Sequence, residues 1–154
     1  MVAATIISDE NILLASSGGK LIRLDTKEIG ISSRISTGVK GMSLGDNEEV
    51  VAVAAIWDPK DDIALFTENG YGKRLHPTEF TVQGRGGKGI IGFKVDNIRG
   101  PLVGIAMVND EDLVLLSGTT NAICIPWSSI PVSTRVAKGV IMIKDNKVVS
   151  VSKV

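Results

Sequence analysis

The part of the sequence with the clearest chemical character is a heptapeptide at positions 83–89, which reads Gln-Gly-Arg-Gly-Gly-Lys-Gly. Its glycines remove side-chain bulk, so an anion could approach the backbone N–H groups closely. Arg85 and Lys88 would supply positive charge for a phosphate, and Gln83 would add an uncharged hydrogen bond. The same residues could also form a purely structural loop between two strands. The heptapeptide therefore indicates either a phosphate contact or a tight connection.

A dinucleotide-binding fingerprint is one alternative for this stretch, because positions 84–89 fit the pattern G-x-G-x-x-G. In that motif the glycines lead from a strand into a helix whose N-terminus holds the pyrophosphate. Here a β-rich run at 90–95 follows, and Asp96 comes too soon to reach a ribose. A P-loop is excluded as well, because no Ser or Thr follows Lys88. We therefore expect no nucleotide cofactor.

The sequence has too few cysteines and histidines for other common kinds of catalytic or metal site. Cys124 is the single cysteine and His76 the single histidine, which excludes a disulfide framework, a zinc cluster and a His-based triad. We expect a reduced thiol in a strand and a histidine at a surface corner. Trp57 and Trp127 lie in corner segments, where we expect them to pack rather than to stack on bases. No catalytic residue, metal site or cofactor is therefore predicted, and the chain by itself is not an enzyme.

The composition predicts one globular piece without membrane contact. The chain has 154 residues, 44% of them apolar, and its 17 Lys and Arg balance 17 Asp and Glu. The apolar runs are too short for a membrane-spanning helix, and the first residues lack the basic flank of a signal peptide. A reducing, cytoplasmic setting is therefore expected.

Three repeats position the candidate residues. The pattern R-x-x-[TK]-G begins at Arg34, Arg85 and Arg135, which lie 51 and 50 residues apart. The same offsets carry apolar positions onto one another: Ile12 onto Ile63 and Leu113, Leu24 onto Leu75 and Ile125, and Ile29 onto Phe80 and Ile130. A period near 50 residues is typical of propeller and solenoid architectures.

Each repeat reads as four short strands. An apolar strand and a turn such as Asn69-Gly70 lead into an alternating second strand, because Asn-Gly favours tight hairpins. A third strand begins at a glycine, as at Gly89–Val95, and a Val-rich strand closes the unit. No window keeps helical periodicity over three turns. The sequence therefore predicts an all-β, propeller-like domain of three blades with about four antiparallel strands each.

The repeat sets the expected organisation of the chain. We predict blades at 8–56, 57–108 and 109–154, and we interpret 1–7 as the last strand of a preceding blade. Closed propellers usually need four or more blades, so three suggest a fragment, an open arc or half of a dimeric ring. Self-association of the chain is one of the outcomes that this organisation allows.

Charge is segregated within each repeat. Segments 20–40, 73–99 and 121–144 hold five bases against two acids, six against two and three against none, while acids gather in the connectors. Because equivalent positions of equivalent blades point the same way, these basic middles would form one curved stripe facing a phosphate backbone. The candidate DNA-binding residues are Lys20, Arg23, Arg34, Lys40, Lys73, Arg74, Gln83, Arg85, Lys88, Lys94, Arg135 and Lys138.

Several motifs together resemble one family. The heptapeptide 83–89 resembles the signature box of the A subunit of DNA gyrase. Segments 17–23 and 69–74 resemble hairpins from the blades of that subunit's C-terminal domain. The resemblance implies the last three blades of a six-blade β-pinwheel, a disc whose blades exchange strands and whose rim bends duplex DNA. It also implies a non-catalytic role in negative supercoiling, in the nucleoid, beside the N-terminal cleavage core of gyrase A and the gyrase B protein.

Two features depart from the family pattern. The family's box lies in the first blade and usually has a basic residue where this chain has Gly84, so the box that wraps DNA could lie outside this chain. The related protein of topoisomerase IV carries a pinwheel without a strong box, and remains an alternative family.

We therefore expect a module that binds and bends double-stranded DNA mainly through phosphates, because a β surface offers no helix for a groove. The alternative is a propeller whose basic stripe binds an acidic protein partner.

Overall fold

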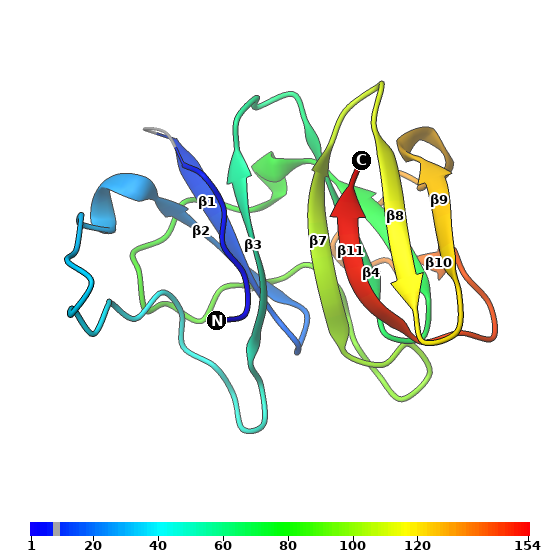
Figure 1. Cartoon of the computed structure of the whole chain (residues 1–154), viewed down its shortest axis with the longest axis horizontal. Helices are drawn as coiled ribbons and strands as arrows, with labels where there is room; N and C mark the ends of the chain where they lie inside the picture. The colour runs from blue at the N-terminus through cyan, green and yellow to red at the C-terminus, as the bar shows by residue number, and fades with distance from the viewer. Residues whose placement is uncertain (8–9) are drawn as a thin grey trace.

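The molecule is all-β, as the sequence predicted. The structure, a computed structural model, describes residues 1–7 and 10–154, which form eleven strands and three short 3₁₀ helices (Figure 1). The strands are β1 (Asn11–Ser16), β2 (Lys20–Asp25), β3 (Val50–Ile56), β4 (Asp62–Thr67), β5 (Tyr71–Leu75), β6 (Ile90–Ile91), β7 (Leu102–Val108), β8 (Leu113–Gly118), β9 (Ala122–Pro126), β10 (Val140–Ile141) and β11 (Val148–Lys153). The 3₁₀ helices are η1 (Thr26–Glu28), η2 (Pro77–Glu79) and η3 (Trp127–Ser129). In this described part, no helix is long and apolar enough to cross a membrane.

The strands form three antiparallel sheets that exchange their outer strands. The orders are β3-β1-β2-β6, β7-β4-β5-β10 and β11-β8-β9. The outer strand β6 belongs to the second repeat but pairs with β2 of the first, and β10 of the third repeat pairs with β5 of the second. A sheet is therefore completed by the repeat that follows it in the chain. Within the described residues, the third sheet has three strands.

The outer strands are shorter than expected. The run Gly89–Val95 forms ladder pairs only at Ile90 and Ile91. The next two N–H groups, those of Gly92 and Phe93, both donate to the carbonyl of Gly19 at 2.9 and 3.1 Å, which ends the ladder.

The hairpins explain the repeat register and correct one part of it. Gly19 and Gly70 follow the first strand of their repeats with φ of 80° and 84°, the left-handed region that glycine tolerates. In the third repeat the turn is one residue shorter, so Val114 rather than Leu113 takes the place of Ile12 and Ile63 opposite the second strand. Burial agrees, since Val114 is fully buried and Leu113 is 42% exposed.

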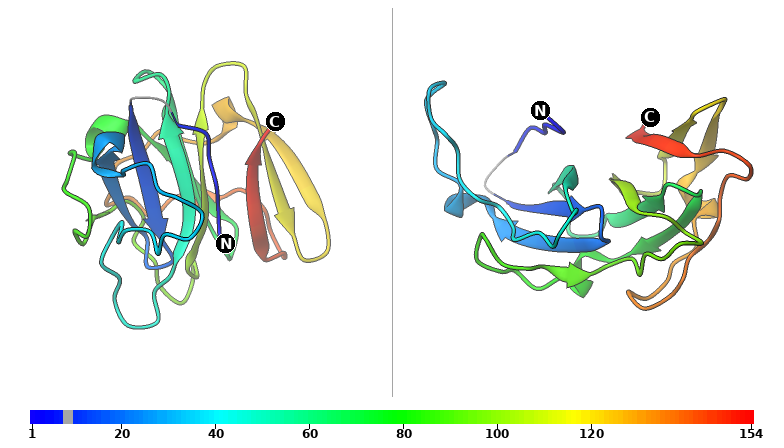
Figure 2. Two further views of the ribbon diagram at one scale, coloured as in Figure 1. Left: turned by 60° about the vertical axis from the view of Figure 1, so that its left-hand side comes forward. Right: turned by 90° about the horizontal axis from the view of Figure 1, so that it is seen from below.

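Two apolar layers hold the sheets together. One lies between the first and second sheets and includes Leu13, Leu65 and Phe93; the other lies between the second and third and includes Phe66, Leu116 and Ile143. The innermost strand β7 packs against both β3 and β11. Figure 2 shows the result, an arc whose chain ends lie on its inner side and whose segments 81–89 and 131–139 lie on its outer side, while the segment 30–38 extends from one end of the arc.

Residues 1–7 are exposed and pair with no strand of the described chain, and their interpretation as the last strand of a preceding blade stays a prediction. One expectation about the tryptophans is not met. Trp57 is 51% exposed and so is not the packing residue expected, whereas Trp127 is partly buried in the layer between the second and third sheets.

Candidate nucleic-acid interface

Three equivalent loops carry half of the candidate residues. We call them rim loop 1 (30–38), rim loop 2 (81–89) and rim loop 3 (131–139). Rim loop 2 lies along the edge of the first sheet, where the N–H of Gln83 donates to the carbonyl of Arg23 at 2.8 Å and that of Gly86 donates to Gly41 at 2.7 Å. It leads directly into β6, the outermost strand of that sheet.

Rim loop 3 is bound to the second sheet in the same way. The N–H of Arg74 donates to the carbonyl of Pro131 at 2.9 Å, and the N–H of Ser133 donates back to the carbonyl of Arg74 at 2.9 Å. The loop then enters β10, the outermost strand of the second sheet. Both loops therefore occupy the same place on successive sheets, at the outer side of the arc (Figure 2).

The last glycine of the R-x-x-[TK]-G pattern has a conformational reason. Gly38, Gly89 and Gly139 have φ of 75°, 72° and 71°, values that other residues adopt only with strain. This residue turns the rim loop into the outer strand. The repeated pattern thus records a backbone requirement as well as a recurring charge.

The other glycines of rim loop 2 expose its backbone. Gly86 has φ of 82° and open space around the position where a side chain would begin. The N–H of Arg85 already donates to a carboxylate oxygen of Glu28 at 2.8 Å. The N–H of Arg85 therefore already binds an anionic oxygen, whereas those of Gln83 and Gly86 are used by carbonyls, so a phosphate at this N–H would have to displace Glu28.

Six of the candidate side chains are exposed. Within the described residues, none of them forms a side-chain hydrogen bond or ion pair: Arg34, Lys40, Arg85, Lys88, Lys94 and Lys138. Four of the six lie in rim loops, Lys40 follows rim loop 1, and Lys94 follows β6. These ammonium and guanidinium groups are free to meet a ligand from solvent.

Three other candidates are partly engaged. Arg135 lies 3.4 Å from Glu79 and its side chain remains 38% exposed. Lys20 lies 3.3 Å from Glu48, whose pKa is lowered first by the N–H of Gly45 and then by this lysine. Gln83 is half-buried within rim loop 2.

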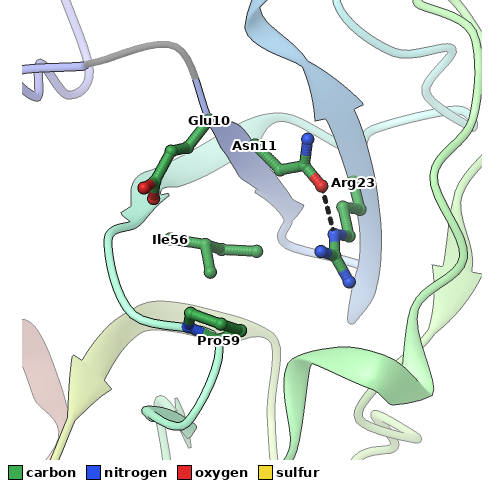
Figure 3. Close-up of a pocket in the computed structure, with 5 residues that line it drawn as sticks. All are labelled: Glu10, Asn11, Arg23, Ile56 and Pro59. Atoms are coloured by element: carbon green, nitrogen blue, oxygen red, sulfur yellow. Dashed lines mark hydrogen bonds between the residues drawn. The ribbon is translucent and has the colours of Figure 1, made fainter.

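Arg23 belongs to a hollow of about 260 Å³ rather than to the rim loops (Figure 3). Its Nε donates to Asn11 Oδ1 at 2.8 Å, and a terminal guanidinium nitrogen lies 3.3 Å from the carbonyl of Pro77. Glu10 is the acid that lines the same hollow. Across residues 1–7 and 10–154, no group of three or more His, Cys, Asp or Glu could hold a metal.

Lys73 and Arg74 are corrected from DNA contacts to structural residues. The ammonium of fully buried Lys73 donates to the carbonyls of Thr134, Arg135 and Ala137 at 2.8, 2.8 and 2.9 Å. Burial lowers the pKa of Lys73 from 10.5 to about 8, an effect that Glu79 opposes and Arg135 reinforces.

Arg74 is 7% exposed and lies over the ring of Trp127 at 3.8 Å. Its Nε donates to the carbonyl of Ile130 at 2.9 Å, and its guanidinium pairs with Asp62 at 2.8 Å. Neither Lys73 nor Arg74 can reach an external phosphate, because the atoms that carry their charge are used to hold the chain around rim loop 3.

Arg99 has a structural role that the sequence did not reveal. It is 8% exposed, pairs with Asp96, and donates from Nε to the carbonyl of Lys138 at 3.0 Å. Together with Lys73 it binds four carbonyls of rim loop 3. The sequence around Arg99 does not indicate this role, because one partner, Lys138, lies in the next repeat and the other, Asp96, lies in the turn before Arg99.

Acidic side chains gather away from these loops. Asp58, Asp61, Asp62, Asp110 and Glu111 line one hollow of about 450 Å³, with Lys60 among them. Burial and the neighbouring Asp58 raise the pKa of Asp61. The zero net charge of the chain therefore conceals a basic outer rim and an acidic cluster.

Comparison with known proteins identifies the family. The family model described as DNA gyrase C-terminal domain, beta-propeller, matches residues 10–56, 61–109 and 125–154. The DNA gyrase A protein of Helicobacter pylori is 33% identical over 93% of this chain, and that of Staphylococcus aureus (strain MRSA252) is 34% identical over all of it. The chain spans 18% of the length of either relative.

Solved structures agree with this match. A structure of a DNA gyrase A C-terminal domain has a TM-score of 0.86 at 26% identity, over 95% of this chain and 51% of that one. The C-terminal domain of a DNA topoisomerase IV has a TM-score of 0.88 at 24% identity, over 94% of this chain and 46% of that one, and shows the shared fold. The chain belongs to the family of DNA gyrase C-terminal domains, with the β-propeller architecture that its three exchanged sheets display.

Proposed function

We propose that this domain binds and bends double-stranded DNA along its outer rim. The observation that carries the proposal is the equivalent placement of exposed bases immediately before the outermost strands. Arg85 and Lys88 precede β6, and Lys138 precedes β10. A duplex that follows the outer side of the arc meets these groups in succession.

The contacts go mainly to phosphates. The rim is made of loops and short strands, which give no helix to enter a groove, so base edges are not read directly. The open space at Gly86 lets a phosphate come close to the loop, and Arg85 and Lys88 supply positive charge beside it. Because the rim is curved, sequence preference comes from how readily a DNA segment bends.

The biological role follows from the family. As part of a gyrase-type topoisomerase, the domain presents a bent duplex to the N-terminal cleavage core of the gyrase A protein, which works together with the gyrase B protein. It contributes no catalytic group of its own, and its bend sets the direction of strand passage for negative supercoiling. The protein then works in the cytoplasm, at the nucleoid.

A salt titration tests the DNA-binding step. Six exposed bases at the rim give an expected slope of about −5 for log K against log salt, at ~0.9 per phosphate contact. The variant Arg85→Ala/Lys88→Ala should reduce the size of that slope by about 2 and weaken binding at low salt. Fluorescence anisotropy of a labelled duplex measures both quantities.

The matched control is Lys60→Ala/Lys153→Ala, which removes the same charge. Lys60 lies in the acidic hollow, and Lys153 lies on the innermost strand β11, 3.3 Å from Asp112. This control should bind DNA as tightly as the unchanged chain. A slope near zero, or equal losses in both variants, contradicts rim binding; absence of any DNA affinity instead favours an acidic protein partner.

A further inference from the structure

Two of the 3₁₀ helices end on an acid that reaches the rim loop of the following repeat. The helices η1 and η2 end at Glu28 and Glu79, the same position in successive repeats. A carboxylate oxygen of Glu28 accepts from the N–H of Arg85 at 2.8 Å, and that of Glu79 lies 3.4 Å from Nε of Arg135. Both arginines begin the R-x-x-[TK]-G pattern. Rim loops 2 and 3 are thus each contacted by a carboxylate from the repeat before them.

The carboxylate of Glu28 stands where an anion from solvent would approach rim loop 2. A Cβ at Gly86 would meet nothing within 4 Å, and one at Gly84 would first meet the Glu28 oxygen itself, at 3.9 Å. Within residues 1–7 and 10–154, Glu28 pairs with no lysine or arginine side chain. The backbone of the loop therefore holds this anion. A backbone N–H accepts a carboxylate or a phosphate oxygen with the same geometry.

Rim loop 2 is fixed to the first repeat by other bonds than the one to Glu28. The N–H groups of Gln83 and Gly86 donate to carbonyls of that repeat. The N–H and the hydroxyl of Ser43 donate to the carbonyls of Gly87 and Gly86, both at 2.8 Å. These four bonds remain when Glu28 is replaced. The acid therefore fills an anion position on a loop whose shape does not depend on it.

We propose that Glu28 and Glu79 occupy anion sites on rim loops 2 and 3, and that a phosphate enters each site by displacing the carboxylate. Both acids are exposed, and exposed charge pairs contribute little, so the exchange is reversible. Where the phosphate belongs to duplex DNA, the inference rests on the proposed function. There the two acids lower the affinity of the rim for DNA, so neutralising one of them strengthens binding. Loss of a residue that positions the loop has the opposite effect.

The variant Glu28→Gln tests this control of DNA affinity. Its amide oxygen still accepts from the N–H of Arg85 while the negative charge is lost. We expect the variant to bind a labelled duplex about three times more tightly at low salt. The slope of log K against log salt should become steeper by up to about 1. Glu79→Gln should act in the same direction, but Glu79 also faces Lys73 and opposes the lowering of its pKa, so Glu28 gives the cleaner test.

The matched control is Glu111→Gln, which makes the same chemical change in the acidic hollow. This control should bind the duplex with the affinity and the salt slope of the unchanged chain. Weaker binding by Glu28→Gln, or an equal gain in both variants, overturns the proposal.

Inorganic phosphate tests the anion site without DNA. In Glu28→Ala the N–H of Arg85 loses its acceptor, so phosphate should shift the NMR signal of this amide in a saturable manner. In the unchanged chain the same signal should hardly move over that range, and potassium chloride at matched ionic strength should move it in neither. No phosphate-dependent shift in Glu28→Ala overturns the proposal. A saturable shift in a protein without duplex affinity supports the anion site and contradicts the proposed function.

Discussion

Alanine at the last glycine of each rim loop tests the strand exchange that builds the rim. Gly38, Gly89 and Gly139 share a left-handed backbone, with φ between 71° and 75°. An alanine in this conformation costs about 1–2 kcal/mol wherever it stands. The three variants therefore carry one common penalty, and any difference among them reports what lies next to each loop.

The neighbours of the three glycines differ. A Cβ at Gly89 would lie 2.7 Å from the carbonyl oxygen of Leu21, and one at Gly139 would lie 2.9 Å from that of Gly72. A Cβ at Gly38 meets nothing within 4 Å. A backbone carbonyl inside a ladder moves only if strand pairs separate, so overpacking adds about 1–3 kcal/mol at Gly89 and Gly139. We expect Gly38→Ala to be the mildest of the three by that amount.

Urea unfolding followed by far-UV circular dichroism gives these free energies, provided that sedimentation shows a single copy at the concentration used. Hydrogen exchange at β6 should locate the weakening in Gly89→Ala, whereas Gly38→Ala leaves β6 protected. If Gly89→Ala and Gly38→Ala agree within about 0.5 kcal/mol, rim loop 2 is not packed on β2. The geometry proposed for the DNA surface then fails.

Three further variants separate structural bases from those proposed to contact DNA. Lys73→Met should speed hydrogen exchange in residues 134–139, because three carbonyls lose their donor. Because the pKa of Lys73 is lowered to about 8 in the folded chain, the unfolded chain binds more protons than the folded chain between pH 8 and 10.5. The free energy of unfolding of the unchanged chain should therefore rise with pH over that range. This rise should vanish in Lys73→Met. Arg74→Ala should destabilise the fold by about 3 kcal/mol by leaving Asp62 unpaired, whereas Arg85→Ala should leave stability within about 0.5 kcal/mol and weaken DNA binding. Equal stability of the two arginine variants would contradict the burial of Arg74.

The repeat and the hairpins could be predicted from sequence because their causes are local. Positive φ at Gly70 and at the ends of the rim loops requires glycine, so these residues recur in phase. The origin of the outer strands has no local cause, since Ile90–Ile91 reads the same whichever sheet it joins. Strand exchange was expected only through the family resemblance. The register of the third repeat was off by one residue because its first hairpin is shorter, while its second strand keeps the apparent period.

The burial of Lys73 and Arg74 could not be predicted from the sequence, for a related reason. Lys73 and Arg74 stand in an alternating strand, where a charged residue normally faces solvent. Their carbonyl partners lie about 60 residues later, in rim loop 3 and at Ile130 just before it, and this loop covers them only after strand exchange. Arg85 and Lys88 are exposed because the loop itself is outermost there, and their contact with DNA stays a prediction.

The buried and exposed bases depend on one another. Rim loop 3 can present Lys138 outward because Arg99 binds that residue's own carbonyl, and because Lys73 binds three others nearby. Rim loop 2 lacks such a lysine: Ile22 stands in its place, and a Cβ at Gly87 would lie 3.2 Å from Ile22 Cδ1, closer than an ordinary contact. The glycines of rim loop 2 and the buried lysine beneath rim loop 3 are thus two solutions to one problem, holding a loop flat on a sheet edge. It follows that Gly87 and Gly89 have packing reasons even before any phosphate arrives, whereas Gly84 and Gly86 have room for a side chain. Loss of DNA binding in a glycine variant is therefore interpretable only beside its measured stability.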